Sequence, residues 1–256
     1  MQKPYILAFA NQKGGVGKTT SCINIASCAA ELGLRVLLVD TDPQGNTTTG
    51  LGVKKNELEN TIYEMMLGKA SFDECVVRGV AGGLDLLPAN VNLSGAEIDF
   101  IDLENPHYIL RDKLKDVRKD YDFIIIDCPP SLSMLPINAM TTADSVLVTV
   151  QCEYYALDGL SQLFNTVNLI RSRMNSSLEV DGIVFTMYDS RTNLSYEVVE
   201  NVKENVREHI YKTIIPRNIR LAEAPSYGQP INLYEPRSAG AEAYRMLAKE
   251  VTERKL

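Results

Sequence analysis

The chain has 256 residues, of which 45% are hydrophobic and 23% charged, a composition that fits a folded globular protein and excludes collagen-like and intrinsically disordered chains. It contains neither the apolar run of about 18 residues that suggests a membrane span nor an N-terminal secretion signal, so we expect a cytoplasmic protein. Its net charge of −7 argues, taken alone, against strong nucleic-acid binding, because contact with phosphates needs local positive potential.

Short apolar runs alternate with helical stretches from one end of the chain to the other. The runs predict strands at 5–11, 35–40, 84–88, 123–127, 145–151 and 182–188. Helices are predicted at 18–32, 107–120, 132–142, 157–174, 194–209 and 239–254. This alternation predicts one α/β domain, residues 1–256, with a mostly parallel twisted sheet and helices on both faces. Ligands of such sheets bind beyond the carboxyl ends of the strands.

A glycine-rich loop, NQKGGVGKTT at 11–20, follows the first predicted strand. Its glycines allow a tight turn that aims several N–H groups at an anion, and the next helix adds the positive end of its dipole. Lys18 is placed to reach the β- and γ-phosphates of a nucleotide, and Thr19 to bind Mg²⁺. The strict G-x-x-x-x-G-K-[ST] pattern is not met, because Gln12 occupies its first glycine position. The predicted ATP/ADP contacts are Lys13, Gly14, Gly15, Val16, Gly17, Lys18, Thr19 and Thr20.

Two carboxylates follow the second predicted strand, in the run VDTDPQGN. A spacing of two puts Asp40 and Asp42 on the same side of an extended chain. One can hold Mg²⁺ and the other can orient an attacking water. The alternative for Asp40 is that it only caps its own loop.

Four apolar residues closed by an aspartate form the run FIIID at 123–127. After a phosphate loop, this pattern indicates a buried strand that delivers Asp127 to the magnesium shell. Together with Thr19 and Asp40, Asp127 completes the predicted metal-binding set. Cys128 comes directly before a proline, and we expect it to pack against the backbone rather than act as a nucleophile.

Cysteine and histidine are sparse. The five cysteines are odd in number and include no Cys-x-x-Cys pair, which argues against a disulfide framework or a zinc ribbon. We expect buried free thiols in a reducing compartment. His107 and His209 stand far apart in the sequence without a Cys or carboxylate cluster, so chemistry based on histidine is not expected.

The run KGGVGKT resembles the deviant Walker A motif of the ParA/MinD ATPase family, in which the early lysine reaches across a dimer interface to the partner's nucleotide. That lysine is Lys13 here. The chain is most similar to the short, Soj-like ParA-type chromosome partitioning ATPases, over about residues 5–250. We therefore expect no helix-turn-helix extension of the kind that long plasmid ParA proteins carry. The segments that carry this resemblance are 36–46, 126–132, 151–157, 215–218 and 223–228.

The resemblance implies a magnesium-dependent ATPase that forms an ATP-dependent homodimer. It implies that Lys13, Lys18 and Asp42 take part in hydrolysis, and that the tripeptide Pro216, Arg217 and Asn218 flanks the adenine. The dimer of such proteins binds double-stranded DNA without sequence preference. A ParB/Spo0J-type partner stimulates slow hydrolysis, so the protein would be nucleoid-associated when ATP-bound and would not bind membranes.

Two arginines match the DNA-contacting arginines of Soj-like relatives, Arg191 and Arg220. Lys203, Arg207 and Lys212 are near in sequence and can extend a basic patch, because the intervening glutamates fall at helical spacing on another stripe. Two-fold symmetry would double this patch, so it can outweigh the overall negative charge. We expect weak binding by the monomer, steep salt dependence and contact with phosphates only.

Three rival functions remain. A MinD-like membrane-associated positioning ATPase needs a terminal amphipathic helix with an exposed apolar face, whereas 241–256 is rich in Ala and is expected to pack. An electron carrier like the nitrogenase iron protein needs cysteines that bind a cluster, and Cys128 and Cys152 have no cluster context. A metabolic P-loop enzyme needs a small acceptor, for which the sequence shows no pocket.

Overall fold

The computed structural model describes residues 4–131, 133–153 and 156–255. Seven strands of this described part form one sheet in the order β3-β4-β2-β5-β1-β6-β7. Neighbouring strands run parallel, except that β3 pairs antiparallel with β4 at one edge, which confirms the predicted mostly parallel α/β fold. The strands are β1 (Tyr5–Phe9), β2 (Val36–Asp40), β3 (Val77–Val80), β4 (Leu84–Leu87), β5 (Phe123–Asp127), β6 (Ser145–Gln151) and β7 (Glu179–Thr186).

The helices comprise every predicted helix and several short ones that were not predicted. They are α1 (Lys18–Glu31), α2 (Asn46–Gly50), α3 (Ile62–Met66), α4 (Phe72–Cys75), α5 (Ala96–Asp99), α6 (Ile109–Leu114), α7 (Met134–Thr142), α8 (Ala156–Arg173), α9 (Asn193–Asn205), α10 (Ile219–Glu223), α11 (Ile231–Tyr234) and α12 (Ala239–Lys255). Within the described residues, 3₁₀ turns lie at Lys55–Glu57, Val91–Gly95, Arg118–Asp120 and Ala224–Tyr227. Residues 132 and 154–155, in two segments that carried the resemblance, lie outside the described residues.

Two predicted helices are shorter than expected. The helix predicted at 107–120 ends at Leu114 and is followed by a separate 3₁₀ turn. The helix predicted at 194–209 ends at Asn205, because Val206 is extended and the chain then runs beside β7, where Ile210 bridges to Ile183. Pairing with the sheet therefore overrides the helical pattern at its end.

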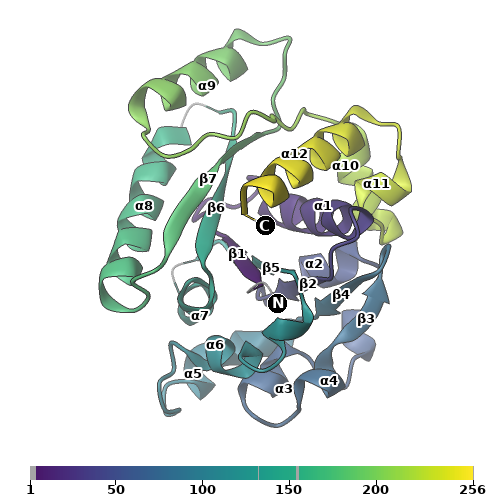
Figure 1. Ribbon diagram of the computed structural model, residues 1–256, viewed down its shortest axis with the longest axis vertical. Helices are drawn as coiled ribbons and strands as arrows, with labels where there is room; N and C mark the ends of the chain where they lie inside the picture. Colours follow the sequence, from purple (N-terminus) through teal and green to yellow (C-terminus); the bar gives the residue numbers. More distant parts are fainter. Residues whose placement is uncertain (1–3, 132, 154–155, 256) are drawn as a thin grey trace.

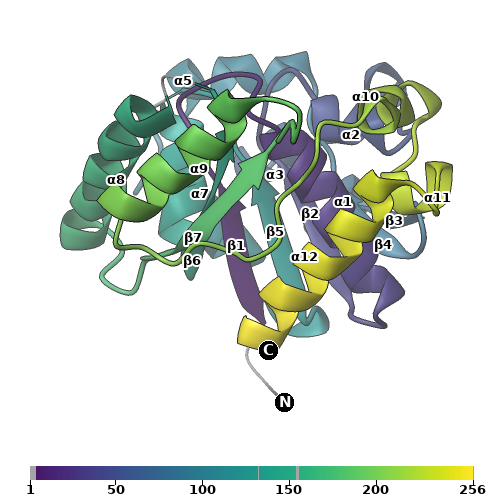
Figure 2. The ribbon, with the colours of Figure 1, turned by 90° about the horizontal axis from the view of Figure 1, so that it is seen from above.

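Helices cover both faces of the sheet (Figures 1 and 2). One face packs against α1 and α12, and the other against α3, α6, α7 and α8. The central strands β2 and β5 are buried at every residue, as expected for strands covered on both sides. No helix in the described part of the chain has the length and apolar character needed to cross a membrane.

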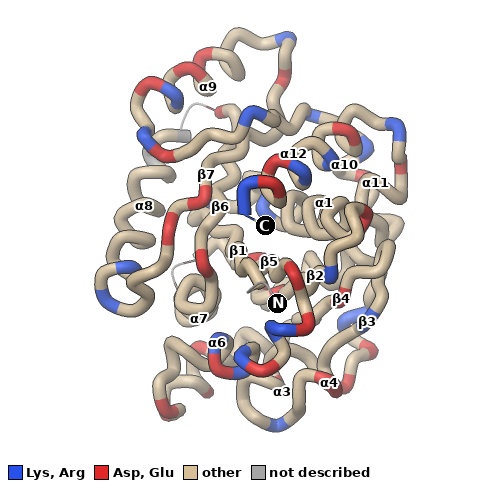
Figure 3. Tube along the Cα trace, viewed as in Figure 1, with Lys and Arg blue, Asp and Glu red and all other residues tan. Residues whose placement is uncertain are grey.

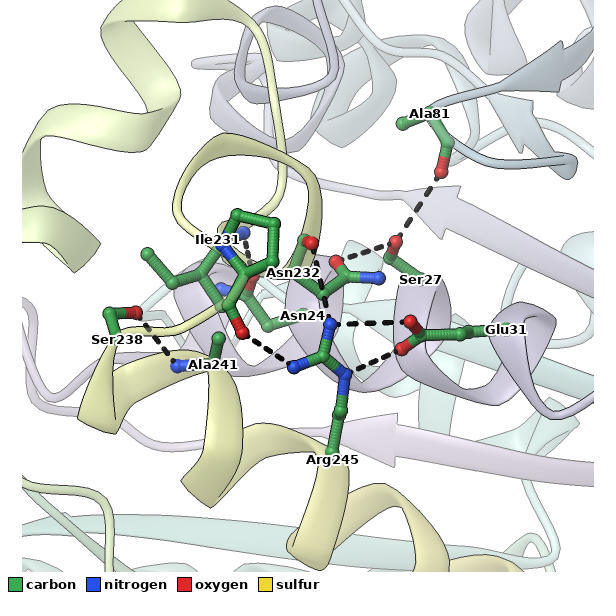
Figure 4. A network of polar contacts seen from close by, with 10 residues as sticks. Asn24, Ser27, Glu31, Ala81, Ile231, Asn232, Ser238, Ala241 and Arg245 are labelled. Carbon is green, nitrogen blue, oxygen red and sulfur yellow. Dashed lines mark hydrogen bonds and ion pairs between the residues drawn. The ribbon is translucent and has the colours of Figure 1, made fainter.

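A polar network ties α12 to α1 at the surface of the molecule (Figure 4). The Arg245 guanidinium donates to both carboxylate oxygens of Glu31, at 2.9 and 3.2 Å, and to the carbonyl of Pro236 at 2.7 Å. Close by, Ser27 Oγ donates to Asn232 Oδ1 at 2.9 Å. These contacts fix the segment that leads into α12 against the first helix.

The sheet order brings three strand ends together. β5 lies between β1 and β2, and its last residue, Asp127, is in register with Phe9 on one side and Asp40 on the other. The glycine-rich loop leaves β1 directly after this point. Both predicted strand-end carboxylates and the loop therefore share one edge of the sheet.

Candidate functional site

The glycine-rich loop is anchored to two strands. Asn11 donates from Nδ2 to the carbonyl of Thr149 on β6 at 2.8 Å and accepts from the Lys13 N–H at 2.9 Å. On the other side, Thr186 Oγ1 of β7 donates to the carbonyl of Val16 at 2.9 Å. The loop is therefore held in shape before any ligand binds.

Lys18 begins α1 directly after the left-handed Gly17. The lysine is only 7% exposed, and its Nζ donates to the carbonyl of Lys13 at 3.2 Å, across the loop. Burial lowers the pKa of Lys18, although the nearby Asp127 carboxylate works in the opposite direction. A buried cation inside a loop of backbone N–H groups is an environment that favours a bound anion.

Asp127 is the centre of a buried cluster of hydroxyl groups. Its Oδ2 accepts from Thr19 Oγ1 at 2.8 Å and from Thr47 Oγ1 at 2.7 Å, and the carboxylate is fully buried. Burial raises the pKa of Asp127, against the effect of the two hydroxyl donors. A positive charge beside this carboxylate would relieve the cost of its burial.

The same cluster fits Mg²⁺ by its chemistry. Carboxylate and hydroxyl oxygens are hard donors, which Mg²⁺ prefers. The described residues contain no group of three or more His, Cys, Asp or Glu side chains that could hold a metal alone. Mg²⁺ is usually bound through one or two carboxylates together with phosphate oxygens and waters, so Thr19 and Asp127 would hold it jointly with a nucleotide.

The two aspartates of the second strand end have different surroundings. Asp40 is fully buried; its Oδ1 accepts from the Asp42 N–H at 3.1 Å, and its Oδ2 from the N–H and hydroxyl of Thr48 at 2.9 and 2.7 Å. Burial, with the charge of Asp127, raises the pKa of Asp40 to about 7. These contacts favour the loop-capping alternative for Asp40 over a metal ligand.

Asp42 lies two residues farther along the chain, and it is 9% exposed. Its Oδ1 accepts from the Gln44 N–H at 2.9 Å. The turn therefore fixes one carboxylate oxygen, and the same side chain has a small exposed surface through which it can contact a water.

A cavity of about 630 Å³ opens beside the loop. It is lined by Gly17 and Thr20 on the loop side and by the tripeptide 216–218 on the other. A bridge between Tyr188 and Pro216, with the Arg217 N–H donating to the carbonyl of Tyr188 at 2.9 Å, sets the tripeptide against the end of β7. The cavity is large enough for a nucleoside, and its position joins the predicted adenine-flanking residues to the phosphate loop.

Lys13 points away from this interior. Its Nζ lies 3.4 Å from Glu153, in an ion pair whose side chains are 40% and 51% exposed. Gly14 and Gly15, next to it, are exposed. The loop therefore has one buried lysine and one lysine at its outer rim.

The two arginines predicted to contact DNA are both paired with carboxylates nearby in sequence. Arg191 forms a two-point contact with Asp189, at 2.8 and 2.7 Å, and its side chain is 83% exposed. Arg220 lies 2.7 Å from Glu223. Arg191 lines the same cavity as the tripeptide, and Arg220 follows Ile219, another lining residue. Helix α9 carries three glutamates and one lysine, so acidic side chains predominate along it (Figure 3), and Lys203 is paired with Glu200.

Sequence reasoning did not single out three residues that organise the site: Asn11, Thr47 and Thr186. Thr47 stands in a run of threonines after Asp42, and a hydroxyl so close to a predicted catalytic carboxylate is a signal that could have found it. Thr186 is a strand residue far from every motif, and only the sheet order brings it to the loop.

The described cysteines are buried and free. Burial raises the pKa of Cys152 to about 12 and that of Cys128 strongly.

Comparisons with known proteins cover nearly the full chain. A model of the AAA domain family matches residues 4–180. The chain is 52% identical to the sporulation initiation inhibitor protein Soj of Bacillus subtilis, over 96% of this chain and 97% of that protein. It is 47% identical to the chromosome partitioning protein ParA of Caulobacter vibrioides, over 97% and 94%.

Solved structures match this chain over a similar share of its length. A cobyrinic acid a,c-diamide synthase from Mycobacterium smegmatis with bound ADP and magnesium has a TM-score of 0.86 and 37% identity, and the match covers 96% of this chain and 93% of that one. The cell division ATPase MinD of Pyrococcus furiosus has a TM-score of 0.79 and 25% identity, over 98% and 99%. The loop, the strand ends and the cavity all fall within these matches.

Proposed function

Because the chain belongs to the ParA/Soj family of chromosome partitioning ATPases, it is an ATPase that uses ATP and Mg²⁺, and we propose that it uses ATP as a timer. ATP joins two copies face to face, and the dimer binds double-stranded DNA without sequence preference. Hydrolysis, stimulated by a ParB/Spo0J-type partner, separates the copies and releases the DNA. The protein is cytoplasmic and associates with the nucleoid when ATP-bound.

The observation that carries this proposal is the separation of the two loop lysines. Lys18 is buried within the loop, whereas Lys13 is at its rim and pairs with Glu153. A single nucleotide held by Lys18 leaves Lys13 directed outward. A second copy that brings its own nucleotide to this rim would give Lys13 a triphosphate to neutralise, which supports a contact across the dimer interface.

Hydrolysis at this site needs a positioned water and a charge-compensated triphosphate. Asp42, fixed by its turn and slightly exposed, would orient the water. Lys18 and the loop N–H groups would hold the β- and γ-phosphates, while Thr19 and Asp127 would hold Mg²⁺. When bound, the ion supplies neutralisation of the charge that develops on the transferred phosphoryl group. The tripeptide 216–218 would flank the adenine.

DNA binding by the dimer would use Arg191 and Arg220. Each is paired with a carboxylate in the monomer, so each must exchange that partner for a DNA phosphate. With a net charge of −7 for the chain, the local patch has to be doubled by symmetry to attract DNA. We therefore expect binding that needs ATP and that weakens steeply with salt.

Sedimentation of the Asp42→Ala variant tests the proposal. This variant should bind ATP without hydrolysing it and so accumulate as a dimer. The dimer should co-sediment with non-specific duplex DNA at low salt, while the ADP-bound and nucleotide-free samples should remain monomeric and free of DNA. The double variant Asp42→Ala, Arg191→Ala is the matched control, since it should dimerise but lose most of its DNA.

A monomeric Asp42→Ala variant in saturating ATP would overturn the proposed dimer. A dimer that floats with lipid vesicles and ignores DNA would favour the membrane-associated alternative. In α12, Tyr244, Leu247 and Val251 are buried. Met246, which is 56% exposed, is the one large apolar side chain of the described helix at the surface, and a single side chain does not make the apolar face that membrane binding needs.

A further inference from the structure

The segment that carries Asp42 is attached to a single residue at both of its ends. At the start, the N–H and hydroxyl of Thr41 donate to the carbonyl of Asp127 at 3.0 and 2.6 Å. At the end, Thr47 Oγ1 donates to the carboxylate of the same aspartate at 2.7 Å. Residues 41–47 therefore form a closed loop on the end of β5, with Asp42 inside it.

The two attachments differ in kind. The Thr41 N–H continues the backbone ladder between β2 and β5, and its hydroxyl donates to the same carbonyl, so both contacts hold only the residue before Asp42. Between Asp42 and α2 the chain makes a turn of its own, in which the Gly45 N–H donates to the Asp42 carbonyl at 2.8 Å. The Thr47 hydroxyl joins this turn to the carboxylate of Asp127, and both of these side chains are fully buried.

We propose that Thr47 is a positioning residue for hydrolysis, whose buried hydroxyl holds the Asp42 turn against the carboxylate that also accepts from Thr19. The inference rests on the hydrolytic role proposed for Asp42. One carboxylate oxygen accepts both threonine hydroxyls, so the Asp42 turn and the first turn of α1 are aligned by the same atom. Thr47 acts through Asp42 and need not touch the nucleotide.

Hydrogen–deuterium exchange of the protein without nucleotide and metal tests the positioning directly. In Thr47→Val, which keeps the shape and removes the hydroxyl, the Gly45 and Thr48 amides should exchange about tenfold faster, since a charge-assisted hydrogen bond is lost. Thr47→Ser keeps the donor and should exchange as wild type. The matched control is Thr49→Val, because the exposed Thr49 hydroxyl bonds only to carbonyls of its own turn.

Steady-state kinetics supply the second readout. Thr47→Val should lower kcat about tenfold while its affinity for ATP stays within about threefold of wild type. Wild-type exchange in Thr47→Val, or faster exchange with unchanged kcat, would overturn the inference. If Thr47→Val does not fold, Thr47→Ala carries the same test. A wild-type protein that never dimerises with ATP would refute the proposed function and leave the exchange result standing.

Discussion

Two lysines five residues apart in one loop have different environments, and the difference comes from the backbone. The turn at Gly15 and Gly17, both at positive φ, folds the chain so that Lys18 enters the loop while Lys13 stays at the rim. Lys18 is surrounded by buried groups, whereas Lys13 has a solvent-exposed carboxylate as its partner. Their substitutions should therefore have separable effects.

Replacing Lys18 with Met should weaken ATP binding by at least about 100-fold, since two charge-assisted contacts to phosphates are lost. Burial disfavours the charged form of Lys18. Without nucleotide, Lys18→Met should therefore unfold at the same temperature as wild type or at a higher one. Isothermal titration and thermal unfolding measure the two effects. Lys13→Met is the control, and its monomer should keep ATP affinity within about threefold. Near wild-type affinity in Lys18→Met would refute the assignment of the phosphate loop.

The ion pair between Lys13 and Glu153 should oppose dimerisation. An exposed pair contributes about 0.2–1 kcal/mol, and closure of a symmetric dimer breaks two of them. In the Asp42→Ala background, Glu153→Gln should therefore tighten the ATP-dependent dimer about two- to thirtyfold, measured by sedimentation equilibrium at low salt.

The gain from Glu153→Gln should disappear near 1 M salt, where the screening length is about 3 Å. Glu253→Gln removes a comparable exposed pair, with Lys249 on α12, and should leave the dimer unchanged. A weaker dimer in Glu153→Gln would mean that this carboxylate stabilises the closed state instead.

Helix α12 is held to the rest of the fold by ion pairs near both of its ends. Arg245 ties its first half to α1, and Lys255 at its last turn lies 2.6 Å from the fully buried carboxylate of Asp181 on β7. Tyr5 and Tyr211 also donate to Asp181. The C-terminal helix is therefore joined to the first helix, to β1 and to the far edge of the sheet.

Lys255→Met should destabilise the protein by about 3 kcal/mol, because it leaves a buried carboxylate without its cation. For a chain of this size that is a fall in Tm of at least about 6 °C. Adding Asp181→Asn should recover part of the loss, and Lys249→Met, at an exposed pair of the same helix, should change stability by less than about 0.5 kcal/mol. An unchanged Tm in Lys255→Met would show that the end of α12 frays without cost.

The ion pair between Lys255 and Asp181 also predicts how the stability of the protein depends on pH. Burial alone would lower the pKa of Lys255, but its hydrogen bonds to Asp181 and Tyr5 outweigh burial, and the pKa is raised. Its contribution to stability is therefore fully present below the ordinary lysine pKa and is lost as pH rises through the raised value. Denaturation curves should show wild type and Lys255→Met converging only in strongly alkaline buffer.

The sequence was informative about elements where periodicity is long and uninterrupted. All six predicted strands are present, β5 and β6 with the predicted bounds, because apolar runs closed by charged or glycine-rich segments leave little ambiguity. Helices of four or five residues such as α3 and α4 were missed; each is set by a local capping box, at Thr61 and Ser71, too short for periodicity to reveal. The edge strand β3 was also missed, because its exposed side chains carry no apolar pattern.

The sequence predicted those features of the site that follow from residue type alone, and missed those that depend on which groups the fold brings together. Glycines, a lysine and strand-end aspartates identify a phosphate loop and its edge of the sheet. The sequence left open whether Asp40 binds metal or caps a turn, since the answer depends on the Thr48 hydroxyl and N–H beside it. Thr47 escaped notice for a similar reason: a hydroxyl becomes informative only when its partner is known.

The face of the molecule that carries the glycine-rich loop is the one on which a second copy would complete the nucleotide site. Lys13 and the exposed glycines form the rim of the loop, the nucleotide cavity opens beside it, and Arg191 borders that cavity with its side chain 83% exposed. Charges elsewhere on the trace are mixed in sign (Figure 3). A dimer closed over the loops would thus join two nucleotides and set the two copies of Arg191 in a fixed relation.

Gly14→Val tests this closure, because the substitution is harmless within one copy. A Cβ added at Gly14 meets no described atom within 4 Å, so the variant should keep its Tm within about 2 °C and should bind ATP normally. Two valines facing each other across closed loops would instead collide, and Gly14→Val in the Asp42→Ala background should remain monomeric with ATP in light scattering. Gly14→Ala, which adds one methyl group, should weaken the dimer to an intermediate degree. A full ATP-dependent dimer of Gly14→Val would mean that the copies meet elsewhere, and Lys13 would then have no triphosphate of a partner to reach.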